Sequence, residues 1–283
     1  MLWQRVVFLL GLAPNLGLTA KLPNLPILGR QVPGATVTSS PNQAGGFVGL
    51  PQHNGDGGPA ITLLQATFPV PNLTFASGQG STGGPYQLSL GCNIDASTDG
   101  SSGSCDGNGP HVGIHANLSG DGSMSYQTWF RWGHGDINPI TSDTQQELNL
   151  TTGDSFYVEI SLSSGTDVAY SAMNLKNTSN QVNWTYSGGS MCSGDGTTAY
   201  AGCYLHVDDT SVMPGFVELD FESIFIYDRS NKTHDIDIDQ QVSFYQLVNN
   251  GKTFAAPLIE EPHDFAIEWS ENPSYGLGDG GNP

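Results

Sequence analysis

Short runs in which apolar and polar residues alternate recur along most of the chain, separated by Gly, Ser, Asn, Asp and Pro. A period of two is typical of a β-strand with one buried face, and no stretch shows the 3.6-residue stripe of an amphipathic helix. The runs predict strands over 60–68, 125–132, 155–162, 182–186, 216–227 and 242–248. This pattern predicts an all-β fold, a two-sheet antiparallel β-sandwich of the concanavalin-like or jelly-roll type.

The chain divides into four segments. Residues 1–20 have one basic residue, the apolar run 6–12 and then small residues, which is the order of a secretory signal peptide. The run is too short for a bilayer span, which needs about 20 apolar residues. Residues 21–41 are rich in proline and predict a leader, short propeptide or linker. We expect a single sandwich domain over 42–272 and a flexible tail over 273–283.

Acidic side chains far outnumber basic ones: 27 Asp and Glu stand against 8 Lys and Arg, and the formal net charge at pH 7 is −19. Nucleic acid and anionic membranes recruit clusters of cations, so we exclude both as partners. The acidity also fits an acidic working medium, in which many carboxylates would be protonated. We expect a secreted, extracellular monomer without a cofactor or resident metal.

Secretion would expose the chain to oxidation and to glycosylation. Four cysteines allow three pairings into two disulfides, and an oxidising compartment makes pairing the default. Cys203 lies only eleven residues after Cys192 across a Gly-rich loop, which favours that pair and leaves Cys92 with Cys105. Asn-x-Ser/Thr sequons predict glycosylation at Asn72, Asn117, Asn149, Asn177, Asn183 and Asn231.

One acidic strand suggests a glycan-active protein. A strand over 218–222 would place Glu218, Asp220 and Glu222 on one face. This Glu-x-Asp-x-Glu pattern resembles the signature of laminarinase- and lichenase-type glycosidases, in which the carboxylates act as nucleophile, supporting acid and general acid. The plain alternative is an acidic outer face opposite apolar residues. The alternative functions are therefore a secreted glycoside hydrolase and a noncatalytic, lectin-like glycan-binding module.

A second resemblance covers more of the chain, from about residue 42 to 270. Segments that resemble successive blocks of the fungal glutamic peptidases, also called eqolisins or peptidase family A4/G1, occur in the family's order at 43–47, 128–132, 150–155, 174–178, 219–224, 239–242 and 249–251. The resemblance implies a secreted acid endopeptidase with a Gln–Glu dyad in the concave groove of one sheet. In that mechanism the Glu activates a water molecule and the Gln amide stabilises the oxyanion.

The chain departs from this family at the dyad itself. The resemblance places Cys203 at the position of the catalytic Glu and His111 at that of the Gln. Other residues that it places in the groove are Asn93, His115, Trp129 and Arg131. The replacements argue against acid endopeptidase activity. They leave a glutamic-peptidase-like protein whose groove binds an extended polypeptide or a cell-wall polysaccharide.

The replacements also suggest a different chemistry. His111 and His115 are four residues apart on a strand and therefore share a face, and the resemblance brings Cys203 near them. A thiolate beside an imidazole can act as a nucleophile with its base, and two His with one Cys can hold a transition metal. Both interpretations require reduced Cys203. The resemblance implies this state, because the family's own bridge would join Cys105 to Cys192.

Overall fold

The computed structural model describes most of the chain between residues 35 and 269. The described ranges are 35–52, 59–76, 78–80, 83–98, 109–133, 138–139, 148–189, 191, 196–236, 242–261 and 263–269. The predicted signal peptide, most of the leader, Cys105, Cys192 and the predicted tail lie outside them. In the described part, the one helical element is the 3-10 turn η1 (Thr210–Val212). None of the described helices is long and apolar enough to cross a membrane.

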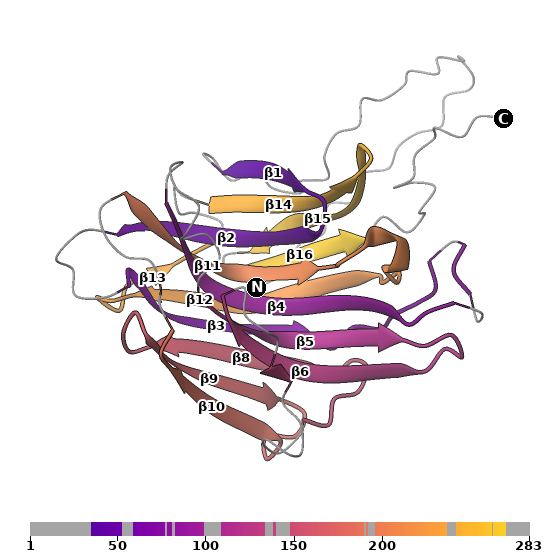
Figure 1. Ribbon diagram of the computed structural model, residues 1–283, viewed down its shortest axis with the longest axis horizontal. Coiled ribbons are helices and arrows are strands. Elements are labelled where there is room, and N and C mark those ends of the chain that lie inside the picture. The colour runs from indigo at the N-terminus through magenta and orange to yellow at the C-terminus, as the bar shows by residue number, and fades with distance from the viewer. Residues whose placement is uncertain are drawn as a thin grey trace, which may run out of the picture.

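Strands make up nearly all the remaining regular structure. They are β1 (Thr36–Ser40), β2 (Gln43–Gln52), β3 (Ile61–Pro69), β4 (Tyr86–Thr98), β5 (Pro110–Leu118), β6 (Met124–Trp132), β7 (Asn138–Pro139), β8 (Ser155–Leu162), β9 (Asp167–Asn174), β10 (Gln181–Ser187), β11 (Thr197–His206), β12 (Glu218–Asp228), β13 (Thr233–His234), β14 (Val242–Asn249), β15 (Lys252–Glu261) and β16 (Asp264–Trp269). Across the described sheet the order is β10-β9-β8-β3-β12-β16-β15-β14-β2-β11-β4-β5-β6-β7, from the bottom of Figure 1 through its top and back.

The long sheet curls so that its two halves pack against each other as two layers. β11 contacts β3 and β12, while β4 and β5 contact β8. β8 buries alternate side chains along its whole length. In the interior the Phe68 ring lies 5.2 Å from the rings of Phe156 and Phe221, measured between centroids. The predicted antiparallel β-sandwich is therefore confirmed.

The transition between layers falls within β12, where the sequence predicted one uninterrupted strand. Its first residues pair with β16 and its later residues pair with β3. Ser223 lies between the two parts with a left-handed φ of 53°, and the register shifts there. A bulge of this kind bends a strand and lets one sheet change direction. The segment assigned to the leader also contains a strand, β1, which runs parallel to β14.

Candidate functional site

Cys203 lies on the core face of the layer formed by β4, β5, β6 and β11. It pairs directly with Cys92 on β4, which pairs with Val112 on β5. Directly opposed residues of antiparallel strands point to the same side of the sheet. All three side chains are fully buried in the apolar core. The predicted meeting of Cys203 with His111 in one groove is therefore wrong, because neighbouring residues of β5 point to opposite faces.

The sulfur of Cys203 forms a disulfide with Cys92. The expected pairs Cys92–Cys105 and Cys192–Cys203 are therefore wrong, as is the implied free state of Cys92 and Cys203. A disulfide sulfur is neither a thiolate nucleophile nor a thiolate metal ligand. Both chemistries predicted for Cys203 are thereby removed. Within the described residues, no group of three or more His, Cys, Asp or Glu side chains could hold a metal ion.

The opposite side of these strands, which we call the outer face, collects the other predicted groove residues. Asn93 pairs with His111, and His111 pairs with Arg131, so the three form one row across β4, β5 and β6. All three side chains thus project from the same side of the layer. The sequence prediction that these residues lie together is consistent with this register.

The next row explains why Trp129 can lie in the middle of the outer face. Tyr204 pairs with Gly91, Gly91 with Gly113, and Gly113 with Trp129. A Cβ atom at Gly113 would lie 2.9 Å from the Trp129 ring, and one at Gly91 would lie 3.2 Å from it. The two glycines therefore leave the space that the indole fills. His115 stacks on this ring, with centroids 5.4 Å apart, and the Arg131 guanidinium lies 5.7 Å from its centroid.

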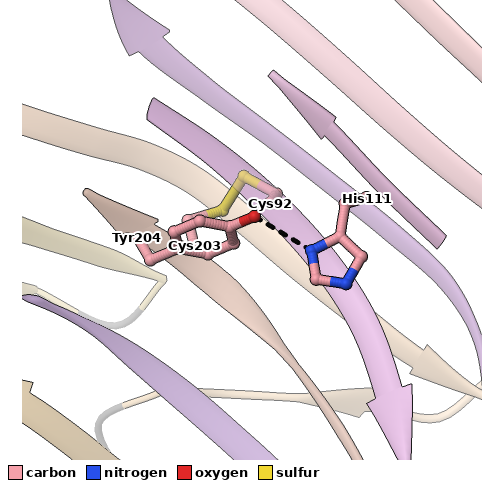
Figure 2. The surroundings of a disulfide bond; sticks show 4 residues. All are labelled: Cys92, His111, Cys203 and Tyr204. Carbon is pink, nitrogen blue, oxygen red and sulfur yellow. Dashed lines mark hydrogen bonds between the residues drawn. A yellow bond between two sulfur atoms is a disulfide. The ribbon is translucent and has the colours of Figure 1, made fainter. Parts of the chain in front are cut away.

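Three side chains of the outer face form a connected polar chain. Asp95 Oδ1 lies 3.2 Å from His111 Nε2, and His111 Nδ1 lies 2.9 Å from the Tyr204 hydroxyl. Figure 2 shows the contact between His111 and Tyr204, with the Cys92–Cys203 disulfide nearby. Tyr204, rather than Cys203, is therefore the β11 residue that meets His111. Sequence reasoning missed Tyr204 and Asp95. Adjacent residues of a strand point to opposite faces, so the residue next to Cys203 was the signal that could have identified Tyr204 as the partner of His111.

The electrostatics of this chain favour a charged carboxylate and a neutral phenol. Burial raises the pKa of Asp95, but the His111 charge and hydrogen bonds from His111, Asn93 and the Gly109 N–H outweigh it, so the pKa lies below its ordinary value. Burial raises the pKa of Tyr204, and the neighbouring Arg131 offsets this only in part. Tyr204 therefore remains a hydrogen-bonding hydroxyl at neutral and acidic pH.

Several buried polar atoms of the outer face form no hydrogen bond within the part of the chain that the structure describes. Among the described residues, Asn93 Oδ1, Trp129 Nε1 and Arg131 Nε make no hydrogen bond. Buried polar groups are nearly always satisfied, by protein, water or a ligand. The three atoms comprise one acceptor and two donors on adjoining rows. A ligand that reached these atoms would have to offer both kinds of group.

The alternative glycosidase residues lie elsewhere. Leu219 and Phe221 are buried, while Glu218 and Glu222 are exposed and Asp220 is half-buried, so the predicted alternation holds. Glu218 lies directly opposite Glu268 of β16. These carboxylates belong to the strand that joins the two layers. They are not part of the rows around His111.

Two blocks of the family resemblance meet at a separate buried carboxylate. Asp154 accepts hydrogen bonds from the Thr151 N–H at 2.9 Å and the Asn174 amide at 2.8 Å, and Lys176 Nζ lies 3.1 Å from it. Burial raises the pKa of Asp154, but these partners lower it to about 2 overall. The 150–155 and 174–178 blocks therefore anchor the fold around Asp154.

The sequons stay predictions. The side chains of Asn72, Asn149, Asn177, Asn183 and Asn231 are exposed, whereas Asn117 is half-buried.

An all-β sandwich agrees with the comparisons to known proteins. The peptidase A4 family model matches residues 43–267, which is most of the chain, and the chain belongs to that family. Scytalido-glutamic peptidase, solved with a peptide-based transition-state analogue, shares the fold at 15% identity and a TM-score of 0.57; the match covers 81% of this chain and 98% of that one.

A second solved relative is SCP-B, described as a member of the eqolisin family of peptidases and solved in complex with the tripeptide Ala-Ile-His. It matches with a TM-score of 0.56 and 15% identity, over 81% of this chain and 98% of that chain. No curated protein matches this chain significantly. The family prediction made from the ordered blocks is thus confirmed.

Proposed function

We propose that this peptidase A4 family protein binds extended polypeptide on its outer face and does not perform glutamic peptidase chemistry. Two structural relatives contain peptide-like ligands, an analogue in one and a tripeptide in the other. The observation that carries the proposal is the pair of adjoining rows through His111 and Trp129, with their unpartnered polar atoms.

The polar atoms of these rows suit a peptide backbone. An extended polypeptide presents N–H donors and C=O acceptors in alternation. Asn93 Oδ1 can accept from an N–H, and Arg131 Nε can donate to a carbonyl.

The carboxylates of this layer support the absence of glutamic peptidase chemistry. In β4, β5, β6 and β11, as the structure describes them, Asp95 is the single carboxylate. Its oxygens already contact His111, Asn93 and the Gly109 N–H. A glutamic mechanism needs a carboxylate that is free to take a proton from water. The outer face of these strands offers none that is unoccupied.

A binding assay with heat-denatured, fluorescein-labelled casein tests the proposal through fluorescence anisotropy. We expect binding by the parent chain and roughly tenfold weaker binding by Arg131→Ala, because one charge-assisted hydrogen bond is worth about 1.5 kcal/mol or more. Asn93→Ala should weaken binding less. Gln181→Ala, an exposed residue of β10, serves as the matched control and should bind like the parent. Equal binding by all variants would refute the outer face as the site.

A digestion assay with the same casein between pH 3 and pH 6 tests the absence of glutamic chemistry. We expect Asp95→Asn to leave any casein cleavage unchanged, because no carboxylate of this layer is free to act as the general base. Casein cleavage that is abolished by Asp95→Asn, in a variant with unchanged circular dichroism, would show that Asp95 acts as a general base. That result would overturn the catalytic part of the proposal.

We also propose that the protein is secreted. The support is the apolar run 6–12, which is followed by small residues. Expression of the full chain in a eukaryotic secretion host should release a product that lacks about the first twenty residues. Amino-terminal sequencing detects this, and retention of the intact chain inside the cell would contradict it.

A further inference from the structure

A third row of the outer face contains a serine between two histidines. Ser89 on β4 pairs with His115 on β5 and with His206 on β11. His115 in turn pairs with Gln127 on β6. Side chains opposed in this way have Cβ atoms about 5 Å apart. The row lies beside the one that contains Tyr204 and Trp129, so it belongs to the same face.

The serine hydroxyl is in contact with one imidazole. Ser89 Oγ lies 2.6 Å from His115 Nδ1. In the tautomer that carries its proton on Nε2, His115 Nδ1 accepts this hydrogen bond, and the imidazole can remove the hydroxyl proton. The His115 ring is held flat against Trp129 by stacking at 27° between the ring planes. A base with a fixed orientation is the second requirement for activating a serine.

The charge state of His115 suits a base. Burial, aided by Arg131 and His206, lowers the pKa of His115 to about 4, although Asp208 acts in the opposite direction. The imidazole is therefore neutral over most of the acidic range. His206 Nε2 lies 3.3 Å from Asp208 Oδ1. These two side chains form an imidazole–carboxylate pair on the other side of Ser89, in addition to the pair of His111 with Asp95.

We propose that Ser89 is a nucleophile activated by His115, and that the row acts on acyl groups, as esters or amides, of ligands held on the outer face. The Ser89 oxygen forms a bond to the carbonyl carbon while its proton moves to His115 Nδ1. The carbonyl electron pair moves to oxygen and then returns, which breaks the bond to the leaving group. That group takes the proton from His115. Water, deprotonated by His115 in the same way, then releases the acid and restores Ser89.

Only the identity of the acyl substrate rests on the proposed polypeptide binding. A fluorophosphonate probe tests the nucleophile independently, because it phosphonylates activated serines. The full-length protein is incubated with the probe at pH 7, and tryptic peptides are analysed by mass spectrometry. We expect one adduct on the peptide that contains Ser89. Ser89→Ala should remove it, and His115→Gln should slow its formation at least tenfold.

Ser125→Ala is the matched control, since Ser125 is an exposed serine on the neighbouring strand β6 and should leave labelling unchanged. Circular dichroism and melting curves verify that the variants fold. Casein binding by the parent chain, measured on the same preparation, separates the two proposals. An unlabelled Ser89 in a protein that still binds casein would overturn the nucleophile alone. Labelling of Ser89 that is unaffected by His115→Gln would overturn the role of His115.

Discussion

The two faces of β11 perform different tasks with adjacent residues. On the core face, Cys203 is fully buried and bonded to Cys92. On the outer face, Tyr204 is almost as buried, yet it contacts His111 in a polar chain that ends at Asp95. Burial alone therefore does not separate structure from function in this layer. The two faces differ in what surrounds β11, which is a disulfide within the apolar core on one side and a chain of hydrogen-bonding side chains on the other.

Removal of the disulfide should have the largest effect on stability. The paired change Cys92→Ala with Cys203→Ala opens a cross-link between residues 111 positions apart. Chain-entropy arguments give a loss of about 4 to 5 kcal/mol in the free energy of unfolding. Urea denaturation measures it. Casein binding by the folded fraction should not change, and a loss of binding would show that the two faces are coupled.

The Asp154 centre provides a second comparison with the outer face, because Asp154, like Asp95, is surrounded by hydrogen-bond donors and has a lowered pKa. Asp154→Ala leaves the Thr151 N–H and the Asn174 amide without an acceptor, which should cost about 3 kcal/mol. Lys176→Ala should cost much less because that side chain is 71% exposed. Denaturant titrations compare the two. Equal losses would mean that the ion pair, rather than the buried hydrogen bonds, stabilises this centre.

Acidification should weaken the outer face before it weakens the Asp154 centre. The folded pKa of His115, about 4, lies below the ordinary 6.5, so the unfolded chain binds more protons and stability falls as the pH drops from 6.5 to 4. Asp154, at about 2 against 3.8, contributes stability above pH 3.8 that is lost as the pH falls toward 2. Melting temperatures from pH 7 to pH 2 record both. His115→Gln should reduce the first phase only, because burial also lowers the pKa of His206 and keeps part of that phase. An unchanged first phase would contradict the assignment to His115.

Tyr204→Phe should have the smallest effect on stability and a clear effect on function. The change removes one hydroxyl that contacts His111 Nδ1 and keeps the ring, so the free energy of unfolding should fall by about 1 kcal/mol. Casein binding should weaken several-fold because His111 loses its orienting contact. Anisotropy and denaturation on the same preparation separate the two effects. A large stability loss with unchanged binding would place Tyr204 with the core rather than the site.

The site was only partly predictable for reasons that particular residues illustrate. The family resemblance led to His111, Asn93 and Arg131, which the structure brings into one row. The same resemblance led to Cys203 and missed Tyr204 by one position. In a strand, one position decides which face a side chain occupies. Ser89 gave no local signal, since its neighbours His115 and His206 come from other strands.

The sequence by itself determined the all-β sandwich and the family, because alternation with a period of two and the order of the blocks are properties of consecutive residues. Only the tertiary structure decided that Cys92 meets Cys203, that Asp95, His111 and Tyr204 form one chain, and that Ser89 lies between two histidines. Those contacts depend on the register between strands far apart in sequence. Register is fixed by how the whole layer buries one face, which no single segment specifies.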